Sequence, residues 1–170
     1  MTVASLNSFV IRAIALGGPE HLPLAGPVLV WEAGQQQQPP MADFNGTQAV
    51  GRITRLEPGA PMIIELKKRP GSSGAPLEGI SLGRGPKNDV VVPHDSISRF
   101  HAVLQQDGTS DLWRIVDAES SNGTWVGALR LRPTVPQWVM DGTRLRLGNV
   151  ELRFLQPPAF RAYLRAAMGG

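Results

Sequence analysis

The sequence predicts an all-β fold, a sandwich of two packed antiparallel sheets, with a C-terminal helix and a mixed N-terminal extension. From about Pro61 onward, short apolar runs alternate with turn residues at the spacing expected of such a sandwich. Near the end of the chain, apolar and charged residues alternate, as in a sheet with one buried and one solvated face. The apolar members of this pattern are Leu145, Leu147, Leu152 and Phe154. At 170 residues, the chain is long enough to bury a hydrophobic core.

The first 59 residues (1–59) are predicted to form an extension that precedes the sandwich. Apolar residues within positions 1–16 recur partly at helical spacing, which indicates a short helix. Asn7 or Ser8 would cap its start, and Gly17-Gly18 would end it.

Residues 26–31 are predicted to follow as one short apolar strand, or as a segment that packs onto the neighbouring domain. The Gln/Pro-rich stretch at 35–40 has nothing apolar to bury, so it is either a flexible linker or a surface loop. We favour the loop, because the apolar segments on both sides have the composition of packed structure.

Residues 60–156 are predicted to hold the strands of the sandwich. Turn residues such as Asp107-Gly108, Gly127 and Asp141-Gly142 separate these strands. The expected strands are 62–67, 77–82, 90–92, 100–105, 112–116, 124–126, 129–131, 139–140, 144–147 and 150–155.

Residues 157–170 are predicted to form a helix that begins at a pair of prolines. Phe160, Tyr163, Leu164 and Met168 would form an apolar stripe along it. Because a single short helix is only marginally stable, we expect it to dock on the N-terminal segment.

Composition and charge exclude several classes of function. The net charge is +3, and the basic residues are dispersed, so no nucleic-acid partner is expected. The one basic triplet, at 67–69, is interpreted as a solvated strand end. With no cysteine, disulfides and thiolate metal sites are excluded. His21 and His94 lack partners at metal-ligand spacing and are interpreted as surface residues, so we expect neither a metal ion nor a cofactor.

The expected location is the cytoplasm, away from membranes. No apolar run approaches the roughly 18 residues that cross a bilayer. The first residues also lack the basic, apolar and small-residue regions of a signal peptide.

Three polar clusters lie where predicted strands turn, so all three can meet at one end of the sandwich. They are Gly83-Arg84, Ser98–His101 and Ser120–Thr124. Together they offer guanidinium, hydroxyl and amide groups, which suit a phosphate with an adjacent peptide backbone. They do not suit catalysis, because no carboxylate or thiol accompanies them.

In this order and spacing, the three clusters resemble the forkhead-associated (FHA) domain, a family that reads phosphothreonine peptides. The segments 88–92 and 141–148 carry further parts of the resemblance, which covers roughly residues 60–156. The resemblance implies the FHA-like sandwich, with peptide-binding loops at one end.

The resemblance also implies a phosphopeptide-binding site of five residues. Arg84 would anchor the phosphate through two charge-assisted hydrogen bonds, Ser98 would donate its hydroxyl, and Arg99 would touch the phosphate. Asn122 would bond the peptide main chain beside the phosphothreonine. Ser121 would add a hydroxyl to the phosphate or to the threonine pocket.

Five further residues are expected to border or support this site. Lys87 lies on its rim and would meet the phosphate or acidic neighbours. Gly83, Gly123 and Thr124 are expected to be architectural. His101 lies near Ser98 and Asp95 in the sequence, a combination that suggests a nucleophile with its base and orienter. The resemblance instead implies a structural histidine that holds the binding loops.

The function implied by the resemblance is a phosphothreonine-dependent protein-binding module in Ser/Thr kinase signalling, and not an enzyme. Its partner would be a phosphothreonine-containing protein, either a Ser/Thr kinase or a kinase substrate. The alternative is an FHA-fold scaffold or oligomerisation module whose contacts are phospho-independent and made by the terminal extensions. The oligomeric state stays open at this point.

Overall fold

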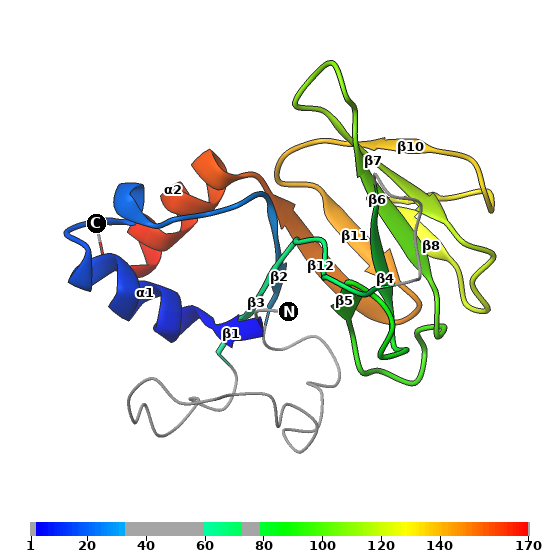
Figure 1. Cartoon of the computed structure of the whole chain (residues 1–170), viewed down its shortest axis with the longest axis horizontal. Coiled ribbons are helices and arrows are strands. Elements are labelled where there is room, and N and C mark those ends of the chain that lie inside the picture. The colour runs from blue at the N-terminus through cyan, green and yellow to red at the C-terminus, as the bar shows by residue number, and fades with distance from the viewer. Residues whose placement is uncertain (1–2, 33–59, 73–78, 170) are drawn as a thin grey trace.

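Two sheets pack face to face, and two helices lie beside them (Figure 1). The computed structural model describes residues 3–32, 60–72 and 79–169. The seven-stranded sheet runs in the order β1 (Val3–Ser5), β3 (Met62–Glu65), β2 (Val28–Trp31), β12 (Val150–Leu155), β11 (Arg144–Leu147), β8 (Thr124–Val126) and β9 (Leu129–Arg130). The five-stranded sheet runs β10 (Gln137–Val139), β7 (Trp113–Asp117), β6 (Ala102–Gln106), β4 (Gly79–Gly83) and β5 (Val90–Val91). The predicted β-sandwich is confirmed.

One strand pair departs from the expected antiparallel pattern. β5 pairs with β4 in parallel, with Leu82 opposite Val90. Asp89, the residue before β5, is hydrogen-bonded to β4 and so holds the two strands together. Its carboxylate accepts hydrogen bonds from the backbone N–H of Ser81 at 2.8 Å and from the Ser81 hydroxyl at 2.9 Å.

Burial raises the pKa of the Asp89 carboxyl, but hydrogen bonds outweigh this effect and hold the pKa below its usual range. The donors are the Ser72 hydroxyl, the backbone N–H of Arg69, and Ser81. A buried carboxylate with this many donors fixes the end of the loop that joins β4 to β5.

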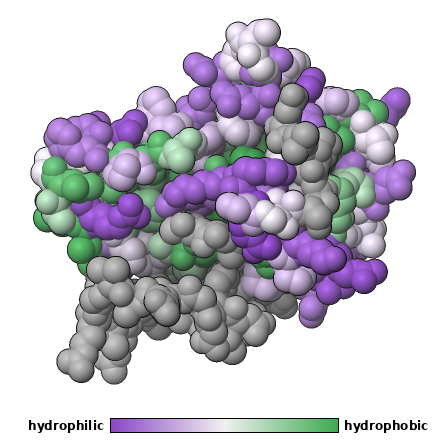
Figure 2. All heavy atoms as spheres, in the orientation of Figure 1, coloured by the Kyte–Doolittle hydropathy of each residue, from purple (hydrophilic) through white to green (hydrophobic). Residues whose placement is uncertain are grey.

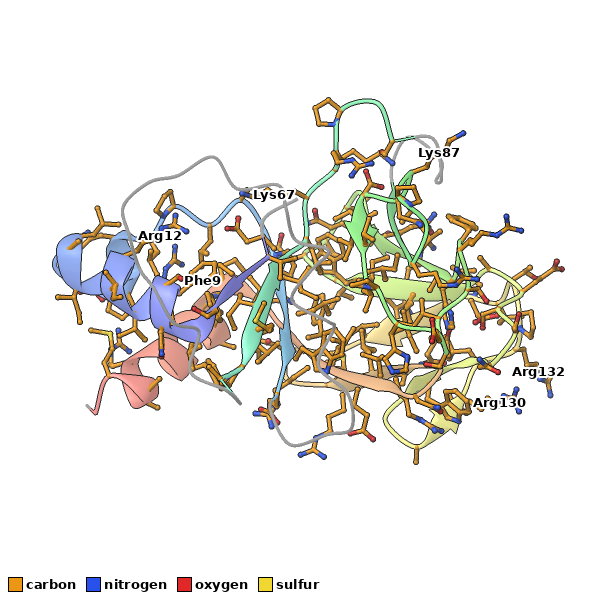
Figure 3. The ribbon with its side chains drawn as sticks, turned by 90° about the horizontal axis from the view of Figure 1, so that it is seen from below. Phe9, Arg12, Lys67, Lys87, Arg130 and Arg132 are labelled. Carbon is orange, nitrogen blue, oxygen red and sulfur yellow. The ribbon has the colours of Figure 1, made fainter. Side chains whose placement is uncertain are left out.

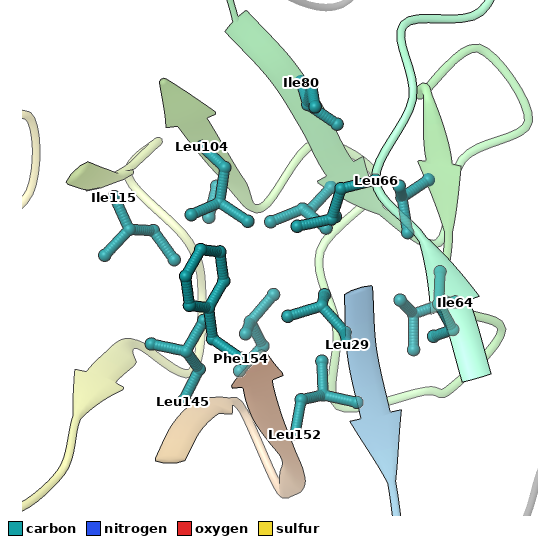
Figure 4. Close-up of a cluster of buried hydrophobic side chains, with 14 of the residues drawn as sticks. Leu29, Ile64, Leu66, Ile80, Leu104, Ile115, Leu145, Leu152 and Phe154 are labelled. Atoms are coloured by element: carbon teal, nitrogen blue, oxygen red, sulfur yellow. The ribbon is translucent and has the colours of Figure 1, made fainter. Parts of the chain in front are cut away.

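The main core fills the space between the sheets (Figure 4). Leu29 and Phe154 reach it from the seven-stranded sheet, and Leu104 and Ile115 from the five-stranded sheet. The alternation predicted near the end of the chain is confirmed, because its four apolar residues are all buried in this core.

A second core lies on the outer face of β2 and β3, under helices α1 (Leu6–Ala15) and α2 (Pro157–Ala167) and the 3-10 helix η1 (Pro19–His21). The Phe9 ring of α1 meets the Phe160 ring of α2 edge-on, at 5.3 Å between centroids. Val30 and Ile63 complete this core from the sheet. The predicted docking of the C-terminal helix on the N-terminal segment is therefore confirmed.

The N-terminal segment differs from the sequence-based expectation in two ways. Ser5 caps α1, rather than Asn7 or Ser8, and its hydroxyl accepts the Ser8 N–H at 3.3 Å. In addition, β1 and β2 both pair with β3, so the boundary expected after residue 59 cuts through the seven-stranded sheet. The Gln/Pro-rich stretch at 35–40 lies outside the described residues.

The surface is mixed in character (Figure 2). Apolar side chains gather at the helical end of the face shown there, whereas hydrophilic residues cover much of the rest. None of the helices in the described ranges is long and apolar enough to cross a membrane.

Candidate functional site

Hydrogen bonds bring the three predicted clusters together at one end of the sandwich. The backbone N–H groups of Arg84 and Gly85 donate to the carbonyl oxygens of Ser98 and Arg99, both at 3.0 Å. The N–H of Ser121 donates to the Ser98 hydroxyl, also at 3.0 Å. The loops after β4, before β6 and after β7 therefore form one continuous surface.

Two glycines allow the first two loops to approach this closely. A Cβ atom on Gly83 would collide with the Arg99 carbonyl oxygen and lie 2.7 Å from the Asn88 amide nitrogen. A Cβ on Gly85 would lie 2.8 Å from the same carbonyl oxygen. The glycines on both sides of Arg84 are therefore required by packing, which accounts for the architectural role expected of Gly83.

Asn88, which belongs to the 88–92 part of the resemblance but was given no supporting role there, joins the same two loops. Its side-chain amide donates to the Gly85 carbonyl at 2.8 Å and to the Arg99 carbonyl at 2.5 Å. Asn88 is almost fully buried, although its place in a turn gave it the appearance of an ordinary loop asparagine.

The cationic side chains of the site are exposed. Arg84 and Arg99 lie in solvent, and within the described residues no hydrogen bond or ion pair occupies either guanidinium group. Lys87 extends from the loop between β4 and β5 (Figure 3). The backbone of Arg84 is fixed by its hydrogen bond to Ser98. Among the described residues, no carboxylate pairs with Arg84, Lys87 or Arg99.

Ser98 and Ser121 form the bridge between the loops. Besides accepting from the Ser121 N–H, the Ser98 hydroxyl lies 3.5 Å from the Ser121 hydroxyl. Two neighbouring hydroxyls can both donate to oxygens of one anion.

Asn122 points its amide nitrogen back to the protein, where it donates to the Ser96 carbonyl at 2.8 Å. An asparagine amide has a second N–H and a carbonyl oxygen that can form further hydrogen bonds. Ser96 was not predicted. Its hydroxyl accepts the Asn149 N–H at 2.9 Å, which ties the turn between β11 and β12 to the site.

His101 is fully buried and bonded through both ring nitrogens. Nδ1 accepts the Ser98 N–H at 3.0 Å, so Nε2 carries the proton and donates to the Gly123 carbonyl at 3.0 Å. Burial lowers the pKa of His101, although the bond to Gly123 and the charge of Asp117 oppose this. A neutral histidine that links two loop backbones is a structural residue and has no nitrogen free to act as a base.

The buried carboxylate of Asp117 holds the loop after β7 in place. Asp117 accepts hydrogen bonds from the Ser120 hydroxyl at 2.6 Å and the Thr124 hydroxyl at 2.5 Å. The Ser120 hydroxyl in turn accepts the Gly123 N–H at 3.0 Å. This gives Thr124 its architectural place. The sequence analysis assigned no supporting role to Asp117, or to Ser120 within the third cluster. The only signal for such a role was an acidic residue at a strand end, three residues before a serine.

The arrangement places hydroxyl, amide and guanidinium donors together, a set that suits a phosphate and an adjacent main chain. The Asp117 carboxylate and the His101 ring are both engaged in structural hydrogen bonds. Among the described residues, no three acidic or histidine side chains come together to hold a metal ion.

Comparisons with known proteins agree with this description. The family model described as "FHA domain" matches residues 80–148. The FHA domain-containing protein PS1 of Arabidopsis thaliana is 35% identical over 68 residues, which is 40% of this chain and 5% of that protein. The transcriptional regulatory protein EmbR of Mycobacterium tuberculosis is 32% identical over 115 residues, which is 64% of this chain and 29% of EmbR. The chain therefore spans less than a third of the length of either relative.

Solved structures with similarity to this chain include the following two. The FHA domain of CT664 from Chlamydia trachomatis is 19% identical, with 77% of this chain and 97% of that chain covered at a TM-score of 0.48. M. tuberculosis EmbR in complex with a low-affinity phosphopeptide is 18% identical, with 87% and 29% covered at a TM-score of 0.45.

Proposed function

We propose that the protein is a phosphothreonine-dependent protein-binding module in Ser/Thr kinase signalling, on the premise that residues 80–148, which match the FHA family model, act as an FHA domain. It docks a phosphorylated segment of a partner protein on the loops at one end of the sandwich. The partner is a Ser/Thr kinase or one of its substrates, and binding leaves the peptide covalently unchanged.

The observation that carries this proposal is the hydrogen-bonded convergence of the three loops around Ser98. Arg84 and Arg99 are presented beside the hydroxyls of Ser98 and Ser121, on backbones that are already bonded to one another. Because the loops are preorganised, a ligand is bound without the cost of ordering them.

Arg84 contributes most to affinity in this arrangement. A phosphothreonine carries nearly two negative charges and three acceptor oxygens, and a planar guanidinium binds two of them side by side. Each charge-assisted hydrogen bond is worth about 1.5–3 kcal/mol. Asn122 then bonds the peptide main chain beside the phosphothreonine, and Lys87 adds charge at the rim.

A degenerate phosphothreonine peptide library tests the proposal, with unphosphorylated and phosphoserine libraries as controls. The wild type is expected to select phosphothreonine peptides, and Arg84→Ala is expected to weaken the best of them by roughly 10- to 100-fold. Arg144→Ala removes an equally exposed arginine away from the site and is expected to bind as the wild type does. A folded wild type that binds no phosphopeptide contradicts the proposal.

A second candidate is a scaffold or oligomerisation module that works through its terminal segments. The observation in its favour is the apolar surface of α1 and the residue after it, where Ile11, Ile14 and Leu16 are 44%, 63% and 47% exposed. Light scattering after size-exclusion chromatography tests self-association. A dimer that Ile14→Asp dissociates supports this candidate, and a monomer at every concentration excludes self-association.

A further inference from the structure

A surface cluster beside the proposed phosphopeptide site stacks two arginines on one tryptophan. We call Arg130, Trp125 and Arg146 the Arg–Trp–Arg stack. Trp125 on β8 lies opposite Arg130 on β9 and opposite Arg146 on β11, so its neighbours come from the strands on both sides. The guanidinium carbons of Arg130 and Arg146 lie 5.2 Å and 3.6 Å from the ring centroid.

The Arg–Trp–Arg stack borders the proposed site through Gly123, the residue after Asn122. A Cβ atom on Gly123 would lie 3.0 Å from Arg130 Nε and 3.1 Å from both Arg130 Nη2 and Trp125 Cη2. The same glycine is held from behind by His101, which donates to its carbonyl oxygen. A peptide bound to Asn122 therefore runs close to the Arg130 guanidinium.

Among the residues that the structure describes, no acidic side chain pairs with the charges of this stack. Within the described residues, neither Arg130 nor Arg146 forms an ion pair. Glu151 lies opposite Arg146 in the strand register but makes no ion pair with it. Arg130 and its neighbour Arg132 project together from the end of the molecule away from the helices (Figure 3).

Stacking on the ring also limits the motion of the two side chains. A guanidinium that is already oriented loses less freedom when it binds an anion than a freely rotating one does. Two like charges on one ring repel each other, and a bound anion removes that repulsion.

Resting on the proposed function, we propose that the Arg–Trp–Arg stack is a second anion site, which selects phosphothreonine segments carrying another anionic group near the phosphothreonine. That group is a carboxylate of Asp or Glu, or a second phosphate. Arg130 makes the contact, since it is the exposed member of the stack that lies against Gly123.

Fluorescence anisotropy with labelled peptides tests the inference. One phosphothreonine peptide with neutral flanks is compared with versions that carry glutamates before or after the phosphothreonine, and with a doubly phosphorylated version. The wild type is expected to bind at least one anionic version about fivefold more tightly than the neutral one, with a smaller gain at high salt. Which version gains identifies carboxylate or phosphate as the preferred group.

Two matched variants separate the stack from general positive charge. Arg130→Gln is expected to lose the gain while still binding the neutral peptide as the wild type does. Arg144→Gln removes the same charge from another exposed residue of the same sheet and is expected to keep the gain.

Four results overturn the inference, and they are distinguishable. Equal binding of neutral and anionic phosphopeptides by the wild type overturns the second site and leaves the proposed function intact. Equal loss of the gain in both variants shows diffuse attraction and overturns the stack as a site. No phosphopeptide binding at all by folded wild type overturns the proposed function and this inference with it. Binding of a single-stranded oligonucleotide that Arg130→Gln abolishes, without a gain for anionic peptides, assigns the stack to nucleic acid instead.

Discussion

At the scale of single residues, the candidate site is built from buried polar groups that hold exposed ones in place. Asp89, His101 and Asp117 are almost fully buried. Asp89 ties the end of the first loop to β4, His101 bonds to the second and third loops, and Asp117 bonds within the third. Arg84 and Asn122, in contrast, are exposed and adjoin the closely packed Gly83 and Gly123. Substitutions of the buried group should therefore disturb both stability and binding, whereas substitutions of the exposed group should disturb binding alone.

Gly83→Ala is expected to lower the free energy of unfolding by about 1–3 kcal/mol, because the added methyl group collides with the Arg99 carbonyl oxygen. It should also weaken phosphopeptide binding by displacing the neighbouring arginine. Urea denaturation measures the first effect. Gly108→Ala is the matched control, since a Cβ there meets nothing within 4 Å. Equal stability of the two variants would contradict the packing described here.

His101 should make the protein less stable in acid. Its pKa in the folded protein lies below the usual 6.5, so the unfolded chain takes up its proton first as the pH falls. Stability should therefore be complete above about pH 6.5 and decline below it, by up to about 1.4 kcal/mol per pH unit for this one group. Urea denaturation between pH 7.5 and 5.5, with NMR titration of the ring protons, measures both. A His101 ring that titrates at 6.5 or above argues against this account.

At the scale of elements, β2 and β3 are buried on both faces. Leu29 and Ile64 face the core between the sheets, while Val30 and Ile63 face the core under the helices. This explains why residues 28–31 read as a continuous apolar run rather than an alternating one. It also makes α1 and α2 integral parts of the domain, because removing them would expose one face of both strands.

Phe160→Ala is expected to lower the free energy of unfolding by about 3–5 kcal/mol, since the ring is fully buried against Phe9. Ile14→Ala, on the exposed face of α1, should change it by no more than about 0.5 kcal/mol. Chemical denaturation of both variants decides the matter. A small effect of Phe160→Ala would mean that the helices are loosely attached.

The elements also show where prediction from the sequence succeeded and failed. Alternating runs such as 144–155 identified β11 and β12, because side chains of a half-buried strand must alternate. β1 has only three residues, too few for any periodic signal, and no pattern in β2 reveals its partners.

In the candidate site, motifs in the sequence identified the exposed hydrogen-bond donors. Asn88, Ser96 and Asp117 were not identified as supporting residues, because a buried polar residue has the same sequence appearance as a turn residue.

At the scale of the whole molecule, the proposed binding loops lie at one end of the sandwich and the two helices pack on the outer face of β2 and β3. In the described parts of the chain, none of the hydrogen bonds of the site loops involves α1 or α2. Distant changes without shared contacts add in their effect on stability. The two regions should therefore respond independently to mutation.

Combining Phe160→Ala with Ser98→Ala tests this independence. The losses in free energy of unfolding should add within about 0.5 kcal/mol, as expected for separate sites. Phosphopeptide affinity should fall with Ser98→Ala and be unchanged by Phe160→Ala at temperatures where the protein stays folded. Weaker binding by folded Phe160→Ala would reveal coupling between the helical layer and the loops.

The pairing of β2 with β12 has a consequence for the order in which the two sheets form during synthesis. Residues 28–31 find one of their two neighbouring strands only at residues 150–155, near the far end of the chain. Closing so long a loop is slow compared with forming local hairpins. On the ribosome, β2 must wait for this partner until residues 150–155 have been made. The hairpins of the five-stranded sheet can form earlier, while the seven-stranded sheet is completed only after synthesis has passed β12.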